Sequence, residues 1–111
     1  MKTNSEVETE TRKTIEFVEK WLNHPPSVTL SEIRTLSNSS LKLWEDVFLS
    51  KTFPTDVWLY EESLTWVAYC AIDSVLKVYE DYPTKPNLQN LLRLLVIECV
   101  EGYNERIKEG V

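Results

Sequence analysis

The sequence contains a single histidine, His24, which is followed directly by Pro25 and Pro26. A histidine that acts as a general base must lie within hydrogen-bond reach of the proton that it removes, often that of a serine or cysteine nucleophile. No such nucleophile can be placed beside His24 from the sequence. Because proline disfavours helical geometry in the preceding residue, we expect His24 to be an ordinary residue at a helix end.

Acidic residues occur in adjacent pairs at Glu45-Asp46, Glu61-Glu62 and Glu80-Asp81. Catalysis by two carboxylates requires that they converge in one cleft, whereas adjacent residues on a helix point in different directions. The two cysteines form no CxxC motif, and the sequence has neither a glycine-rich phosphate loop nor an E-x-x-H pattern. We therefore predict no catalytic, cofactor-binding or metal-binding residues, and a protein that is not an enzyme.

The composition is typical of an all-α fold. The chain has 111 residues, of which 42% are hydrophobic and two are glycine, and a β-rich fold would need more glycine and proline in its turns. Apolar residues recur at helical spacing over residues 5–23, 29–50, 56–80 and 88–108. Short connections make successive helices antiparallel neighbours. We predict a single domain over residues 1–111, built as an antiparallel bundle of four main helices.

The predicted helix over residues 56–80 is the centre of the bundle, because it contains the longest nearly uncharged stretch. Its broad apolar face suits contact with several helices and comprises Leu64, Val67, Ala68, Ala71, Ile72, Val75, Leu76, Val78 and Tyr79. The opposite stripe carries Glu62, Asp73, Ser74, Lys77 and Glu80. Trp66 falls within this polar stripe. Either another helix or the N-terminal segment covers it, as is usual for tryptophan, or it is an exposed anchor for a partner.

The other helices have expected ends and faces. Thr29 with Glu32 predicts a capping box, Thr55 or Asp56 can cap the third helix, and Asn87 can cap the fourth. The apolar face of the second helix comprises Leu30, Ile33, Leu36, Leu41, Trp44, Val47 and Phe48. That of the fourth comprises Leu88, Leu91, Leu92, Leu95, Val96, Cys99, Val100, Tyr103 and Ile107, with Leu94 and Ile97 on its other side.

Two further expectations concern local continuity and the hairpin of the last two helices. The composition of residues 37–40 resembles a loop, but the apolar phase agrees on both sides, so we prefer one long helix over two short helices joined at Asn38. A hairpin that turns near Pro83 brings Cys70 level with Cys99, as free thiols, and Asp73 level with Arg93, as a candidate salt bridge. Free cysteines are typical of the cytoplasm.

The charge is negative and unevenly distributed. The formal net charge of −6 disfavours nucleic acid and anionic membranes as partners. Residues 52–84 hold six acids and one lysine. This acidic face either serves solubility or attracts a basic protein. On the second interpretation, aromatic and acidic residues of this region form the partner-binding surface: Trp58, Glu62, Trp66, Tyr69, Asp73, Glu80, Asp81 and Tyr82.

The segment Glu80-Asp81-Tyr82-Pro83 resembles the acidic, Tyr-Pro-containing loop of colicin nuclease immunity proteins, which are also acidic four-helix proteins. The likeness covers four residues, and this chain lacks the doubled tyrosine. It implies a toxic nuclease as the partner. From the concentration of acidic and aromatic residues over residues 56–82 we predict a non-catalytic binding protein that inhibits or neutralises a basic protein. The alternatives are a structural or adaptor subunit of a homo- or hetero-oligomer, such as a homodimer, and a bundle that binds a small ligand or acts as an enzyme.

Overall fold

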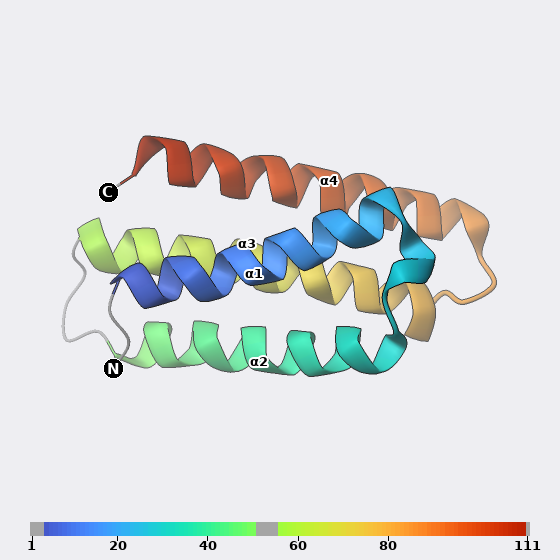
Figure 1. The fold of residues 1–111 in the computed structure, drawn as a ribbon, viewed down its shortest axis with the longest axis horizontal. Helices are drawn as coiled ribbons and strands as arrows, with labels where there is room; N and C mark the ends of the chain where they lie inside the picture. Colours follow the sequence, from blue (N-terminus) through green and yellow to red (C-terminus); the bar gives the residue numbers. More distant parts are fainter. Residues whose placement is uncertain (1–3, 51–55, 111) are drawn as a thin grey trace.

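A computed structural model describes residues 4–50 and 56–110 of the chain. It contains four α-helices, α1 (Asn4–Asn23), α2 (Leu30–Leu49), α3 (Asp56–Glu80) and α4 (Pro86–Glu109), and a short 3-10 helix, η1 (Pro25–Ser27). The described residues contain no strand. Successive helices run in opposite directions (Figure 1). The all-α prediction is confirmed, and each predicted helix boundary lies within two residues of the observed one.

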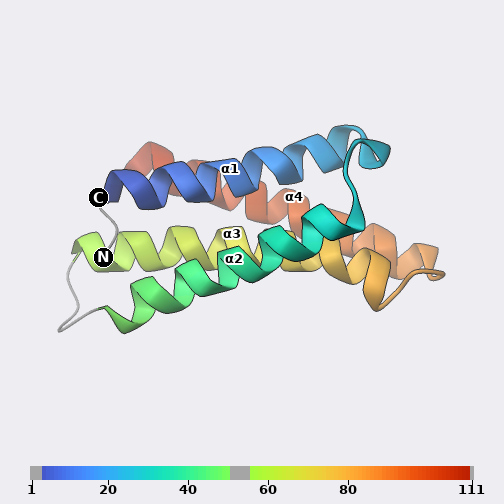
Figure 2. The same cartoon turned by 60° about the horizontal axis from the view of Figure 1, so that its bottom comes forward.

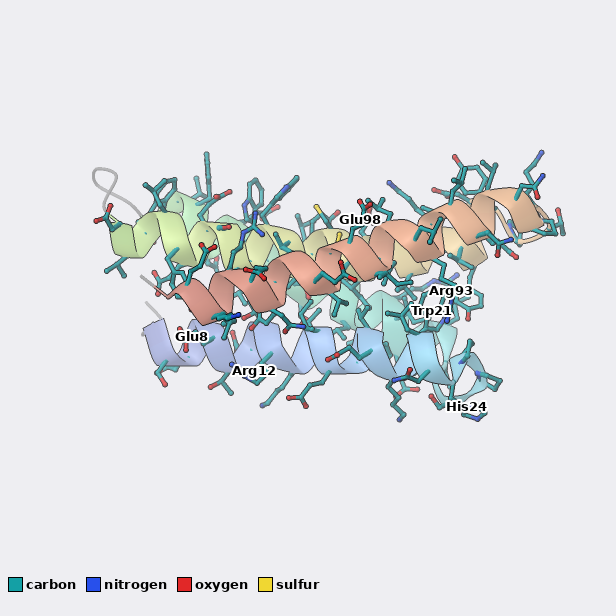
Figure 3. All side chains as sticks on the ribbon, turned by 90° about the horizontal axis from the view of Figure 1, so that it is seen from above. Glu8, Arg12, Trp21, His24, Arg93 and Glu98 are labelled. Atoms are coloured by element: carbon teal, nitrogen blue, oxygen red, sulfur yellow. The ribbon has the colours of Figure 1, made fainter. Side chains whose placement is uncertain are left out.

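Helix α3 is the centre of the molecule. It packs against α1, α2 and α4, whereas α2 and α4 make no contact with each other in the described part of the chain. Helix α1 lies across one side of α3 (Figure 1). On the side of α3 away from α1, α2 and α4 do not meet, and no described helix covers the strip of α3 between them. Figure 3, seen from the α4 side, shows α1 and α3 on opposite edges of the molecule.

The core is built from the apolar faces of all four helices. Fully buried side chains include Val18 of α1, Ile33 of α2, Leu64 and Ile72 of α3, and Val96 of α4. A smaller cluster of Val7, Leu43 and Val47 packs with Trp58 where α1 begins. Because these faces are mainly apolar, burial of their side chains supplies the main stabilisation of the fold. None of the described helices is long and apolar enough to cross a membrane.

Helix α2 is continuous through the loop-like residues 37–40, as predicted. Ser37 and Ser40 lie on its inner face and are buried. The hydroxyl of Ser40 is 3.3 Å from that of Thr14 on α1. Small side chains at these positions let the helices approach closely, and a hydroxyl that is bonded inside the protein carries little desolvation cost. At the start of α2, Thr29 and Glu32 form the predicted capping box.

Several predicted details are wrong. Helix α4 begins at Pro86 with Lys85 at the N-cap position, so Asn87 is not the cap. Asp56 is the first residue of α3, and Thr55 lies outside the described residues. Ser74, expected on the polar stripe of α3, is buried and donates to the carbonyl of Cys70. Its small side chain lines the groove between α3 and α4, and the backbone bond satisfies its hydroxyl.

The apolar face of α4 is wider than the surface that it buries. Leu91 and Leu95 were expected inside but are exposed. Helix α4 contacts α3 and α1 and does not reach α2, so two neighbours cover only part of its apolar circumference. Tyr79 of α3 is also more exposed than expected, because its hydroxyl lies at the edge of the bundle, where it accepts a hydrogen bond from Trp21 Nε1 at 2.8 Å.

Candidate functional site

Aromatic side chains form a continuous row over the surface where α2 meets α3. In order, this aromatic row comprises Trp58, Phe48, Trp44, Trp66 and Tyr69. Neighbouring ring centroids lie 4.9–6.1 Å apart. The spacing follows from helix geometry, because residues three or four apart share one side of a helix. Helices α2 and α3 pack antiparallel along their length (Figure 2). Rings of α2 therefore neighbour rings of α3, as in the pairs Trp44–Trp66 and Phe48–Trp58.

Trp66 is both partly covered and partly exposed. The ring of Trp44 packs against it with a centroid distance of 4.9 Å, so a neighbouring helix does cover one part of it, as is usual for tryptophan. Even so, 43% of its surface is accessible to solvent. The other side of Trp66 borders a groove between α3 and α4. Trp66 therefore lies at the centre of an open surface that extends over three helices.

Two tryptophans of the row are held in place by hydrogen bonds. Trp44 Nε1 donates to Glu62 Oε1 at 3.1 Å, and Trp58 Nε1 donates to the carbonyl oxygen of Val47 at 2.8 Å. Both bonds connect α2 with α3. A ring that is fixed before binding loses little conformational entropy when a partner packs on it. The aromatic row is therefore preorganised for contact with another molecule.

The aromatic row has a negatively charged border. Burial raises the pKa of the Tyr69 hydroxyl, and the charges of Asp73 and Glu45 raise it further. Asp73 Oδ2 pairs with Lys77 Nζ at 3.3 Å, and the hydrogen bond to Asp73 raises the pKa of Lys77. Glu62 lies in the row itself as the acceptor for Trp44. A cationic group approaching the rings therefore meets carboxylates contributed by both helices.

The predicted binding residues fall into two groups. Trp58, Glu62, Trp66, Tyr69 and Asp73 lie along one stripe of α3 beside α2. Glu80, Asp81 and Tyr82 lie at the far end of α3, where Glu80 pairs with Arg34 Nη2 at 3.0 Å. Fourteen residues separate Trp66 from Glu80, which is about 21 Å along a helix. The structure thus gathers the first group into one surface and places the segment that resembles the immunity-protein loop beyond its edge.

Trp44 and Phe48 belong to the aromatic row but were not among the predicted binding residues. Their four-residue spacing was visible, but the same periodicity assigned them to the apolar face of α2. In the structure, that face extends past the edge of α3, so Phe48 is exposed and Trp44 is half-buried. The only signal in the sequence for this part of the surface was a tryptophan and a phenylalanine four residues apart near the edge of an apolar face.

The groove between α3 and α4 has a volume of about 450 Å³ and contains both cysteines. Cys70 and Cys99 are free thiols at the same level of the hairpin, as predicted. Burial raises the pKa of both, and each thiol also has a nearby group that disfavours its charge, Asp73 for Cys70 and Cys70 for Cys99. Thiols with raised pKa values stay protonated near neutral pH and are weak nucleophiles.

Arg93 does not pair with Asp73 as predicted. Its Nη2 donates to the carbonyl oxygen of Leu22 at 2.7 Å, and its guanidinium lies 6.0 Å from the ring centroid of Trp21. Figure 3 shows Arg93 turned from α4 toward Trp21 of α1. Asp73 instead pairs with Lys77 and lines the groove between α3 and α4. Arg93 therefore joins the end of α1 to α4 and stabilises the fold outside the aromatic surface.

His24 is exposed at the turn after α1 (Figure 3). Within residues 4–50 and 56–110, no group of three or more histidine, cysteine or acidic side chains is arranged to hold a metal ion.

The chain matches no protein-family model, no curated protein and no solved structure.

Proposed function

We propose that this protein is a non-catalytic binding protein that inhibits or neutralises a basic protein partner, in the manner of an immunity protein. The observation that carries the proposal is the exposed centre of the aromatic row, where Trp66 keeps 43% of its surface accessible among rings already fixed in place. Tryptophan and tyrosine in such positions commonly contribute most of the energy of a protein interface.

The charge of the molecule supports a basic partner. The chain carries a formal net charge of −6, and Glu45, Glu62 and Asp73 border the aromatic row. Carboxylates around an apolar contact steer a cationic protein toward it and disfavour acidic competitors. We also infer a cytoplasmic location, because both cysteines are free thiols and a reducing compartment preserves them in that form.

The aromatic contact is tested by replacing Trp66. The tagged full-length chain serves as bait in an extract of its own cells, and the captured protein is then purified for titration calorimetry. We expect Trp66→Ala to weaken binding by roughly thirtyfold, the effect of losing a central aromatic contact. Circular dichroism of the variant checks that it remains folded. Capture of acidic proteins only, or unchanged affinity of the folded variant, would contradict the proposal.

The charge contribution is tested by Asp73→Lys, with Glu16→Lys as the matched control. Both variants change the net charge equally, but Glu16 is an exposed residue of α1, across α3 from the aromatic row. We expect Asp73→Lys to slow association and to reduce its dependence on salt concentration, because the lost carboxylate steers the partner. Stopped-flow association rates at low and moderate salt make the measurement. Equal effects of the two substitutions would show that only net charge matters.

A further inference from the structure

Three leucines of α4 are turned away from the core. Leu91 is 61%, Leu94 58% and Leu95 45% exposed, and we call them the leucine patch. They lie within two turns of the helix, which makes no contact with α2 in the described part of the chain. Scattered exposed leucines are ordinary, but a contiguous patch of this kind marks an interaction surface.

The charges along α4 change abruptly beyond the leucine patch. Residues 86–97 contain no acid, and their one cation, Arg93, is turned toward α1. Residues 98–109 carry four acids and two cations, a net charge of −2. Arg106 donates to Ser63 of α3 and to the carbonyl of Gly102, whereas Glu98, Glu101 and Glu105 border one open surface together with Lys108. The N-terminus of the helix is partially positive, and Lys85 stands at its N-cap. Helix α4 thus has a positive end and a negative end with an apolar centre.

We propose that the leucine patch binds a second copy of this chain, with the two α4 helices antiparallel about a two-fold axis. Placing Leu91 of one copy against Leu94 of the other puts Glu98 opposite Asn87, at the positive helix N-terminus of the second copy. The same register brings Glu101 beside Lys85 of the second copy. The two-fold axis repeats each contact, so one surface is complementary to itself. A parallel arrangement would instead set the two acidic halves against each other.

The size of the patch sets the strength of the dimer. Three partly exposed leucines amount to a few hundred Å², whereas a standard interface buries about 800 Å² on each partner. The dimer is therefore weak and depends on protein concentration. Leu95 lines the same groove as Trp66, but Leu91 and Leu94 do not line it. The dimer does not rest on the proposed function, and replacing Leu94 tests it without changing the groove.

The apolar centre is tested by analytical ultracentrifugation of the full chain over about three decades of concentration, up to about 1 mM. The expected result is a shift from monomer to dimer as concentration rises. Leu94→Gln should raise the dissociation constant at least tenfold, because each dimer loses two buried leucines. Leu59→Gln is the matched control, since Leu59 is 50% exposed on α3 and should leave the constant unchanged. A monomer at every concentration, or a dimer insensitive to Leu94→Gln, would overturn the proposal.

The antiparallel register is tested by charge reversal. Lys85→Glu and Glu101→Lys should each raise the dissociation constant, roughly fivefold, because each places like charges together twice in the dimer. The double variant restores opposite charges and should return the constant to within about twofold of the original value. Additive weakening in the double variant would rule out the proposed register. Circular dichroism of all three variants confirms that the measurements compare folded proteins.

Discussion

The capping box at the start of α2 shows how much one residue can specify when its contacts are local. Thr29 Oγ1 accepts from the backbone nitrogen of Glu32 at 3.2 Å, and Glu32 Oε1 accepts from the backbone nitrogen of Thr29 at 2.9 Å. These bonds satisfy two donors that the first turn of a helix leaves without partners. Because both partners lie three residues apart, the sequence alone predicts them.

Removing the cap should destabilise the protein in a pH-dependent way. We expect Thr29→Ala to lower the melting temperature by about 4 °C at neutral pH. The hydrogen bonds with Thr29 lower the pKa of Glu32 from its ordinary value of 4.5. This contribution is therefore present above that value and is lost as the pH falls through the lowered pKa. Melting curves from neutral to acidic pH should show the difference shrinking, whereas Thr35→Ala, on an exposed part of α2, should show no such trend.

At the scale of an element, α2 shows that burial of an inner face can keep a helix continuous through a segment whose composition is typical of a loop. Residues 37–40 look like a loop, yet Ser37 and Ser40 face inward, where they are buried, and Asn38 and Ser39 face solvent. Serine and asparagine are only mildly unfavourable inside a helix. The apolar face on both sides of the segment keeps its phase, and burial of that face outweighs the local preference.

Because α2 packs closely against α1 at Ser40, a larger side chain should destabilise the protein more on the inner face of α2 than on its outer face. Ser40→Leu should lower the free energy of unfolding by about 2 kcal/mol, because Ser40 is buried and a leucine there displaces Thr14, whose hydroxyl lies 3.3 Å away and loses its partner. Ser39→Leu introduces the same side chain at an exposed neighbouring position and should change it by less than about 0.5 kcal/mol. Urea unfolding measures both. Equal losses would mean that α2 has no tightly packed side here.

At the scale of the whole molecule, the number of neighbours decides which apolar residues are buried. Helix α3 contacts three helices, and Leu64, Ala71 and Ile72 are fully enclosed. Helix α4 contacts two helices, and Leu91 and Leu94 remain exposed although α4 contains five leucines and α3 only three. The arrangement is therefore a central helix with three attached helices, rather than a closed square of four.

Two leucines of α3 should consequently respond differently to the same substitution. Leu64→Ala should lower the free energy of unfolding by about 3 kcal/mol, because the side chain is completely buried and its loss leaves a cavity. Leu59→Ala removes the same atoms from a half-exposed side chain and should cost less than about 1 kcal/mol. Denaturant titrations of both variants make the comparison. Similar costs would contradict the central position of α3.

The four helices, the continuity of α2 and its capping box could be predicted from the sequence. These features depend on periodicity and on partners within one or two turns. The exposure of Leu91 and Leu95, the burial of Ser74 and the aromatic row across α2 and α3 could not. Periodicity shows which side chains share a face of a helix, but their burial depends on how many other helices cover that face. In this protein α2 and α4 do not meet in the described part of the chain, and that gap leaves both the aromatic row and the leucine patch at the surface.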